Sequence, residues 1–430
     1  MRWGSEVVSR RSATMFVAPV TPDSRGGGPA QRAFHWLTEL AHTSDVHLVV
    51  VSSSISSDPS PEVRNLVASY RLFAAPRPRC LVAGKVAVSL FPFLAIWRRS
   101  WIQHWVESAT IDSDLSRDPR IGELPIARIV VFRLYMHDIG QSVANALRRV
   151  PVIELDLDDI ESSNQFGMAR LACRRLRLGM ALKSLLSGMH YRLLENRLLR
   201  PYERVYVAAA EDSRRIAHLV DPNRLVVRPN CLSGAITPLD HIRRISSEFT
   251  LLFVGTLGYF PNEDAALWLK EELGPILVKT MPANFRIVVA GRDASRSLRK
   301  SLRKAAFIDF RGELADLAAV YQEADVCVAP LRAGSGTKFK LLEAFLYGRP
   351  IVATREAARG TGARDEVHYL NAEDPTAFAA ACCRLVCDDS LRKALVRQGR
   401  QLLSDHFLFR ASDTAVPPAW GPSPGNGHQP

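Results

Sequence analysis

The strongest chemical signal in the chain is a glycine-rich stretch, Gly334-Ser335-Gly336-Thr337, placed between a strand pattern and a helix pattern. Backbone amides at a helix N-terminus bind anions, and glycines let a ligand approach the backbone closely. Lys338 and Lys340 add positive charge at the same end of the helix pattern. These features predict a site for a nucleotide diphosphate.

Glu343 lies about one helical turn beyond Lys340 and could accept a hydrogen bond from a ribose or sugar hydroxyl. The alternative is an ordinary strand–helix turn that carries a surface Lys–Glu pair. The segment is not a P-loop, because the GxxxxGK[ST] pattern is absent.

Acidic residues follow a strand pattern in the first half, where Asp156, Asp158 and Asp159 stand in the run 153–162. Carboxylates at a strand end could orient the hydroxyls of an acceptor or bind a divalent ion. Alternatively, Asp158 or Asp159 caps the helix that follows.

Two series of strand and helix patterns must position these residues. Strands are expected in the first half at 15–20, 46–52, 129–134, 152–155, 205–209 and 225–227, and in the second half at 250–254, 285–290, 306–310, 326–330 and 350–354. Short runs of Val, Ile and Leu separated by helices are typical of parallel strands buried on both faces. We therefore expect an α/β fold with two Rossmann-like, doubly wound domains.

The expected division of the chain follows from changes in composition. It comprises an N-terminal extension over 1–14, a first domain over 15–235, a linker over 236–248, a second domain over 249–410 and a tail over 411–430. The linker is largely polar and weakly periodic. The tail is rich in Pro and Gly, which predicts disorder.

Composition excludes several classes of protein. The 430 residues are 47% apolar and 23% charged, which excludes wholesale disorder, collagen and coiled coil. The net charge of +12 suits nucleic acid, an anionic lipid surface or phosphorylated substrates. The basic runs at 170–185 and 296–304 lack the interleaved aromatics of a single-strand nucleic-acid platform, so we expect no nucleic-acid partner.

The run 170–185 reads as one basic amphipathic helix that carries Arg174, Arg175 and Arg177. It predicts either adhesion to an anionic membrane surface or a solvated face of a crossover helix.

Seven cysteines, an odd number without CxxC spacing, predict no metal site and a reducing compartment. The first 13 residues lack the apolar region of a secretory signal. The apolar run 86–97 is too short to cross a bilayer as a helix. We expect a cytoplasmic location, with peripheral contact to the inner face of the membrane left open.

Several segments together carry a family resemblance. PLRAGSGTKFKLLEAFLYGRPIVAT, at 330–354, resembles the donor-binding segment of family-4-type glycosyltransferases (glycosyl transferases group 1) with the GT-B fold. FVGTLGYFPNEDAALWL, RGELADLAAVYQEADVCVAP, VVRPN and TPDSRGGGPAQRA resemble further segments of that family in order and spacing. The resemblance implies two domains facing across a cleft. It also implies transfer of a sugar from a nucleotide-diphosphate donor to a hydroxyl acceptor (class EC 2.4), with retention and without a metal or cofactor.

The resemblance also implies roles for single residues. Glu343 matches the family's second motif glutamate, which contacts ribose, whereas Ser335 stands where the first glutamate would fall. The Arg and Lys that many relatives carry after the first strand of this domain are absent around Gly255. Phosphate neutralisation then falls first to Lys340, then to Lys338 and to backbone amides.

In the first domain, Gly27 and Gly28 match a glycine loop that faces the diphosphate, and His137 matches a histidine beside the reacting sugar. A lone histidine is also commonly structural. The expected donor is a UDP- or GDP-sugar, and the expected acceptor is a glycan, a lipid-linked molecule or a small molecule.

Assembly of envelope polysaccharide or lipopolysaccharide is the expected pathway, with glycosylation of natural products second. Two further readings stay open. One is a GT-B scaffold without turnover that binds membrane or polyanion. The other is a nucleotide-sugar isomerase, which would turn over without an acceptor.

Overall fold

The computed structural model describes residues 12–52, 58–74, 124–147, 150–234, 236, 248–314, 316–334 and 339–409. The apolar run 86–97, nearly all of the predicted linker, the predicted tail and residues Ser335 to Lys338 lie outside this part of the chain. The described residues divide into two compact units. The first comprises 12–159 and 190–228, and the second comprises 160–189 and 229–409.

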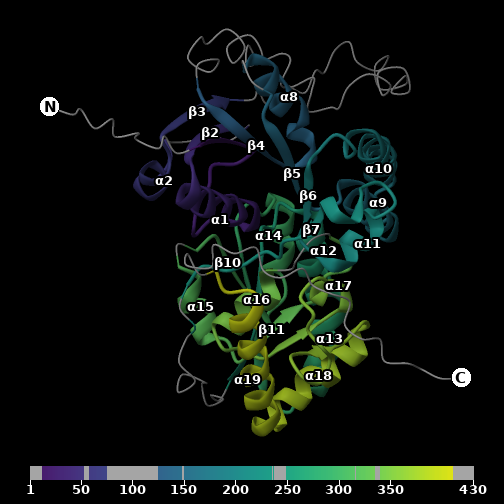
Figure 1. Ribbon diagram of the computed structural model, residues 1–430. Coiled ribbons are helices and arrows are strands. Elements are labelled where there is room, and N and C mark those ends of the chain that lie inside the picture. Colours follow the sequence, from purple (N-terminus) through teal and green to yellow (C-terminus); the bar gives the residue numbers. More distant parts are fainter. Residues whose placement is uncertain are drawn as a thin grey trace, which may run out of the picture. The chain divides into compact units, whose positions relative to one another are not determined.

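The first unit is built on a parallel sheet of seven strands in the order β3-β2-β1-β4-β5-β6-β7 (Figure 1). The strands are β1 Ala13–Ala18, β2 Asp45–Ser52, β3 Ser69–Ala74, β4 Ile126–Phe132, β5 Val152–Asp158, β6 Arg204–Val207 and β7 Leu225–Val227. The helices are α1 Gly28–Thr43, α2 Pro61–Leu66, α8 His137–Ala146 and α11 Ala210–Ile216. All six residues of β1 are buried, as expected for a central strand with helices on both faces.

The second unit contains six parallel strands in the order β10-β9-β8-β11-β12-β13. They are β8 Glu248–Val254, β9 Asn284–Ala290, β10 Ile308–Gly312, β11 Val326–Ala329, β12 Ile351–Ala353 and β13 Leu370–Asn371. Its helices are α9 Glu161–Arg174, α12 Phe260–Trp268, α13 Gly274–Thr280, α14 Arg296–Leu302, α15 Leu317–Glu323, α16 Phe339–Leu346, α17 Arg355–Ala358, α18 Pro375–Cys387 and α19 Asp389–His406, with a π-helical turn at Leu269–Leu273 between α12 and α13.

Both sheets reverse their strand order at one point, between β1 and β4 in the first unit and between β8 and β11 in the second. Helix connections diverge at such a point and leave a crevice at the carboxyl ends of the strands, where doubly wound folds bind ligands. Gly27 and Gly28 follow β1, Gly255 follows β8 and Gly334 follows β11. The two predicted Rossmann-like domains are therefore confirmed, and their glycine loops lie at the reversal points.

The basic segment 170–185 is two helices, which corrects the single helix predicted from sequence. Helix α9 ends at Arg174, and α10 runs from Leu178 to Leu198. Leu176 takes the left-handed backbone at φ 54°, and its N–H donates to the Cys173 carbonyl at 3.0 Å. This is how a helix terminates, usually with glycine at the left-handed position.

The residues 160–189 pack with the second unit, although the sequence predicts an unbroken first domain over 15–235. Figure 1 shows α9 and α10 side by side. Leu171 and Ala172 of α9 form one apolar cluster with Phe260 of α12 and Ala333.

Candidate functional site

The segment between β11 and α16 is held at three points up to and including Gly334, the first residue of the glycine stretch. The Arg332 guanidinium donates to both carboxylate oxygens of Asp264, at 3.0 and 2.6 Å. The Thr354 hydroxyl donates to the Leu331 carbonyl at 2.5 Å, and Arg359 donates to the Gly334 carbonyl at 2.8 Å. Gly334 itself has φ +138°, which a glycine adopts far more readily than other residues.

Lys340 lies in the first turn of α16 and points toward the end of β8. A Cβ added to Gly255 would lie 2.8 Å from the Lys340 ammonium, which is also 5.5 Å from the centre of the Phe253 ring. Burial lowers the pKa of Lys340, and the Glu343 carboxylate partly opposes that shift. Within the part of the chain that the structure describes, the ammonium has no ion-pair or hydrogen-bond partner. It is therefore available to an anionic ligand.

Glu343 lies on the same face of α16, one turn beyond Lys340. Its carboxylate accepts a hydrogen bond from the Tyr321 hydroxyl at 2.9 Å, and Tyr321 stacks on Tyr347 with ring centroids 4.4 Å apart. Burial raises the pKa of Glu343, whereas Lys340 and the Tyr321 hydrogen bond lower it. The tyrosine fixes one carboxylate oxygen, so the carboxylate has a defined orientation.

Gly255 has a steric role as well as a position at the reversal of the sheet. Its added Cβ would lie 3.0 Å from the Asn262 side-chain amide, which donates to the Thr256 carbonyl at 2.9 Å. At the end of the neighbouring strand, Gly291 has φ +152°, and a Cβ there would lie 1.8 Å from the Gly255 carbonyl oxygen. The two strand ends therefore approach so closely that side chains are excluded.

A buried charge cluster occupies the carboxyl ends of the strands in the first unit. Arg32 of α1 donates to both carboxylate oxygens of Asp156, at 2.7 and 2.8 Å, and Trp36 donates to the same group. The Arg32 charge and these hydrogen bonds lower the pKa of Asp156, although burial opposes this shift. Asp156 is fully buried with its oxygens used inside the chain, so it positions α1 against β5.

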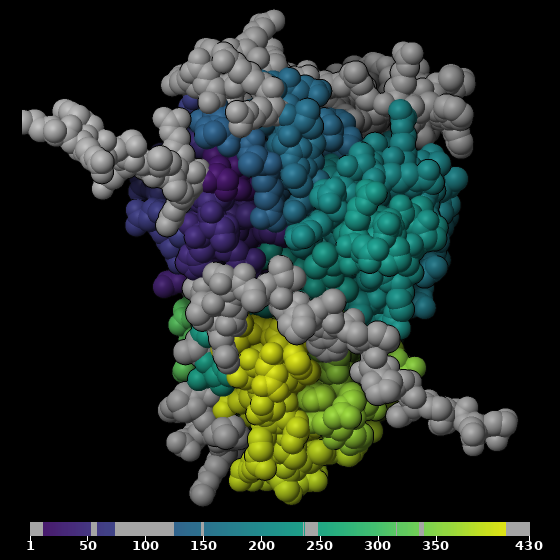
Figure 2. All heavy atoms as spheres, in the orientation of Figure 1, coloured from purple at the N-terminus to yellow at the C-terminus, as the bar shows by residue number. Residues whose placement is uncertain are grey.

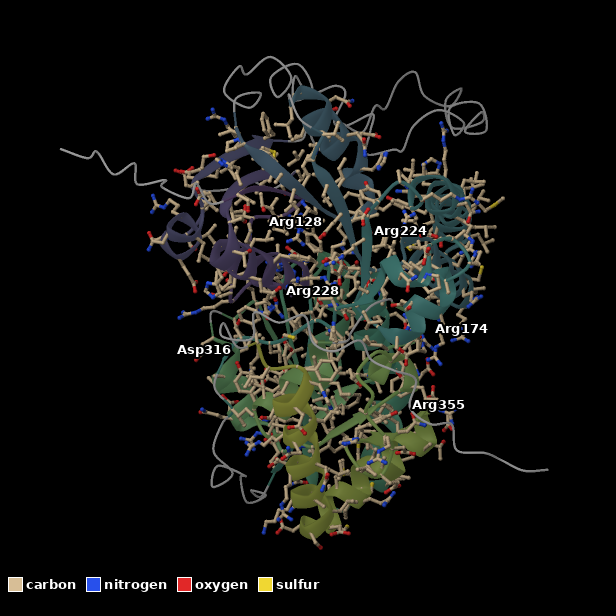
Figure 3. All side chains as sticks on the ribbon, viewed as in Figure 1. Arg128, Arg174, Arg224, Arg228, Asp316 and Arg355 are labelled. Carbon is tan, nitrogen blue, oxygen red and sulfur yellow. The ribbon has the colours of Figure 1, made fainter. Side chains whose placement is uncertain are left out.

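Trp36 is also flanked by two arginines. The Arg228 guanidinium lies 3.7 Å and that of Arg128 5.8 Å from the centre of its ring, and Figure 3 labels both arginines. Arg228 also pairs with Glu39 of α1 at 2.8 Å. These contacts hold α1, and therefore the glycine loop before it, on the sheet.

Arg133 and Asp158 both have left-handed backbones, at φ 76° and 56°. Their side chains pair at 2.6 Å, and Arg133 also pairs with Asp159 at 3.0 Å. Strained non-glycine backbones are concentrated at functional sites. The capping alternative for Asp158 and Asp159 is wrong, because α9 begins at Glu161 with no side-chain cap.

Gly27 and Gly28 form the N-terminus of α1, with Pro29 in the first turn and no side-chain cap. His137 begins α8, and its Nδ1 lies 2.6 Å from the Tyr202 hydroxyl. Burial lowers the pKa of His137 to about 4, so its ring is neutral near pH 7. The structure thus places Gly27, Gly28, His137, Asp156, Asp158 and Asp159 at the carboxyl edge of one sheet.

The sequence of the second unit is similar to a known protein family. Residues 248–388 match the family model for glycosyl transferases group 1. The matched range runs from β8 to the end of α18 and contains Gly255, Gly334, Lys340 and Glu343. A curated relative, an uncharacterised 44.6 kDa protein in the cps region of Klebsiella pneumoniae, is 27% identical over 138 residues. That alignment covers 30% of this chain and 35% of the relative, so it spans about a third of the relative's length.

Solved structures extend the similarity of fold to nearly the whole chain. HepE of Anabaena, solved with UDP and glucose, has a TM-score of 0.57 at 12% identity and covers 92% of this chain and 96% of its own. Sucrose-phosphate synthase of Thermosynechococcus elongatus has a TM-score of 0.61 at 14% identity, over 93% and 95%. WaaG, a glycosyltransferase involved in lipopolysaccharide biosynthesis, has a TM-score of 0.53 at 15% identity. It covers 91% of this chain and 95% of its own. The fold is therefore that of the GT-B glycosyltransferases.

Arg332, Arg359, Tyr321 and Asp264 support the site but were missed by sequence reasoning. Arg332 lies in the PLRAG motif and offered a signal. The other three lie outside that motif, Tyr321 on α15, Asp264 on α12 and Arg359 just after α17. Among the residues described, no cluster of His, Cys, Asp or Glu could hold a metal ion. The same part of the chain contains no helix both long and apolar enough to cross a membrane.

Proposed function

We propose that this protein is a glycosyltransferase that moves a sugar from a nucleotide-diphosphate donor to a hydroxyl acceptor. The observation that carries the proposal is the pair on α16 at the β8/β11 reversal. It consists of a buried ammonium at Lys340, without an ion-pair partner among the described residues, and an oriented carboxylate at Glu343. An anion beside Lys340 would compensate the ammonium for the hydration that it loses on burial. Glu343 would accept a hydrogen bond from a ribose hydroxyl. Lys338, Ser335, Gly336 and Thr337 are proposed as further contacts, with Gly334 and Gly255 leaving room for the ligand.

Cleavage of a sugar–phosphate bond builds negative charge on the leaving diphosphate. Fixed cations and amide dipoles stabilise that charge most where water is excluded. Lys340 supplies such a cation, and in the proposed retaining, metal-independent reaction the leaving phosphate accepts the acceptor's proton. No nucleophile from the protein is then required.

The acceptor is proposed to contact Asp158 and Asp159, because Asp156 is occupied by Arg32. His137, neutral and held by Tyr202, is proposed to lie beside the reacting sugar, and Gly27 and Gly28 beside the diphosphate. A UDP-sugar is the favoured donor, since HepE was solved with UDP and with UDP-glucose. The cps-region relative and WaaG favour envelope polysaccharide or lipopolysaccharide synthesis.

The test is thermal unfolding of the full chain with UDP, GDP and other nucleoside diphosphates. A nucleotide at 100 times its dissociation constant should stabilise the protein by about 2.7 kcal/mol. Glu343→Ala should lose this response, whereas the matched control Glu248→Ala, at the opposite end of β8, should keep it. If no nucleotide stabilises the wild type, the donor site is refuted, and a GT-B scaffold without turnover becomes the better explanation. Turnover of a nucleotide sugar without acceptor would favour an isomerase.

A further inference from the structure

The helix α10 presents an apolar stripe to solvent. Leu178, Leu182, Leu185 and Met189 recur at helical spacing along one face, with exposed fractions of 70%, 58%, 45% and 49%. Leu176, in the turn before the helix, is 84% exposed. Scattered exposed leucines are ordinary, but a contiguous apolar patch marks an interaction surface. We call these five residues the leucine stripe.

A groove of about 670 Å³ runs between α9 and α10 beside the leucine stripe. Its walls include Phe166 and Ala169 of α9 and Leu182 and Leu185 of α10, together with Arg170 and Arg174. Figure 2 shows the teal atoms of this region at the surface of the molecule, and Figure 3 labels Arg174 at its edge. Apolar surface and exposed arginines thus lie side by side.

The charge around the stripe has one sign. Residues 170–200 contain eight Lys and Arg and one carboxylate, Glu195, which is fully buried. Arg175 and Arg177 are tied to Asp264, Glu271 and Glu263 of the second unit. Arg170, Arg174 and Lys183 are exposed and make no ion pair within the described part of the chain. The three exposed cations, rather than the paired arginines, are therefore available to a partner.

From this arrangement we propose that the leucine stripe and Arg170, Arg174 and Lys183 form a docking surface for an anionic lipid bilayer. An amphipathic helix lies in the plane of a bilayer with its apolar side chains below the headgroups and its cations among the phosphates. The stripe from Leu178 to Met189 spans roughly 17 Å along the helix axis. A second copy of the chain is disfavoured as occupant, because pairing two stripes would bring like charges together.

The test is co-sedimentation of the full chain with vesicles of phosphatidylcholine alone, or mixed two to one with phosphatidylglycerol. We expect binding to the anionic vesicles that weakens as salt is raised, and little binding to the neutral ones. Arg170→Ser/Arg174→Ser should weaken binding by about 30-fold, since each cation near an anionic surface contributes about fivefold. The control Arg296→Ser/Arg299→Ser removes the same charge from α14 and should bind as the wild type does.

The apolar part is tested with Leu182→Glu/Leu185→Glu, which should reduce binding by more than about tenfold. Val278→Glu, at a side chain of α13 that is 62% exposed, is the matched control. Sedimentation of the Leu182→Glu/Leu185→Glu protein at wild-type level would refute the proposal, as would a wild type that ignores anionic vesicles.

Two further measurements identify other occupants of the stripe. A wild-type dimer that these glutamates convert to monomer in light scattering, without vesicle binding, would overturn the proposal in favour of a self-interface. If Leu182→Glu/Leu185→Glu lowers the thermal stability of the protein without vesicles by more than Val278→Glu does, another part of the chain covers the stripe. No nucleotide enters these measurements, so their outcome is independent of the proposed sugar transfer.

Discussion

Lys340 illustrates how a single residue can be costly in the free protein and useful in a complex. Burial lowers its pKa, and the described neighbours supply only the nearby Glu343 as a favourable charge. A charge held this way is ready for an anion, because most of its hydration has already been lost.

The residue-scale prediction is that Lys340→Met raises the dissociation constant of a nucleoside diphosphate about 10- to 100-fold. Hydrogen bonds to charged groups contribute about 1.5–3 kcal/mol. Isothermal titration calorimetry would measure the change, with Lys300→Met on the basic helix α14 as the control. An unchanged dissociation constant would remove Lys340 from the phosphate site.

A second residue-scale prediction concerns His35, which is buried in α1. Burial, together with the charges of Arg228 and Arg32, lowers its pKa to about 3. Because the unfolded chain binds the proton near pH 6.5 and the folded chain does not, the stabilisation is complete above pH 6.5 and is lost as the pH falls toward 3. The free energy of unfolding should drop by about 2 kcal/mol between pH 7 and pH 5 from this group alone.

Urea unfolding at several pH values would measure this effect. His35→Gln should flatten the dependence by that amount, and the surface substitution His42→Gln should leave it as in the wild type. An identical pH slope in His35→Gln would contradict the assignment. His137, with its pKa lowered to about 4 by burial, contributes in the same direction.

At the scale of elements, the buried carboxylate of Asp264 joins three parts of the second unit. It lies on α12 and accepts from Arg175, just beyond α9, at 2.6 Å and from Arg332, before the glycine stretch, at 2.6 Å. One carboxylate therefore fixes both the packing of α9 and the segment that leads into the glycine-rich stretch.

Asp264→Asn should lower the free energy of unfolding by about 3–5 kcal/mol. Removing the buried negative charge leaves both guanidinium groups with only more exposed carboxylates, Glu271 for Arg175 and Glu272 for Arg332. Asp309→Asn is the control, since its carboxylate pairs with Arg311 but is 38% exposed and should cost less than about 1 kcal/mol. Denaturant unfolding monitors both variants, and equal costs would show that Asp264 has no special part in joining the elements.

At the scale of the whole molecule, the chain forms two units with separate hydrophobic cores. The proposed nucleotide contacts on α16 belong to the second unit. A ligand bound by one folded unit stabilises that unit by mass action.

Calorimetry of the full chain is expected to show two unfolding transitions. UDP at 100 times its dissociation constant should raise one of them by about 5–11 °C, since about 2.7 kcal/mol of stabilisation acts on a unit of roughly 200 residues. At the same UDP concentration, Lys340→Met should reduce that shift by about half or more without moving the other transition. A single transition that moves as a whole would show that the two units unfold together.

The sequence by itself determined the class of fold, and it predicted where an anion-binding loop would lie. Runs of Val, Ile and Leu such as 285–290 and 326–330 predict buried parallel strands, because only an α/β fold buries both faces of such strands. Glycines before a helix that carries Lys340 and Glu343 predict an anion site. This prediction is possible because all of these residues are close together in the sequence.

Only the tertiary structure decided which charges are used and which are free. Asp156 and Arg32 are 124 positions apart, and Arg175 and Asp264 are 89 apart, so no local pattern predicts their pairing. The same holds for the single basic helix expected over 170–185. Arg175 and Arg177 bind carboxylates of α12 and of the π-helical turn that follows it. Arg170 and Arg174 face solvent beside exposed leucines. Contacts between distant segments set this division, because packing alone determines which side of a helix is covered.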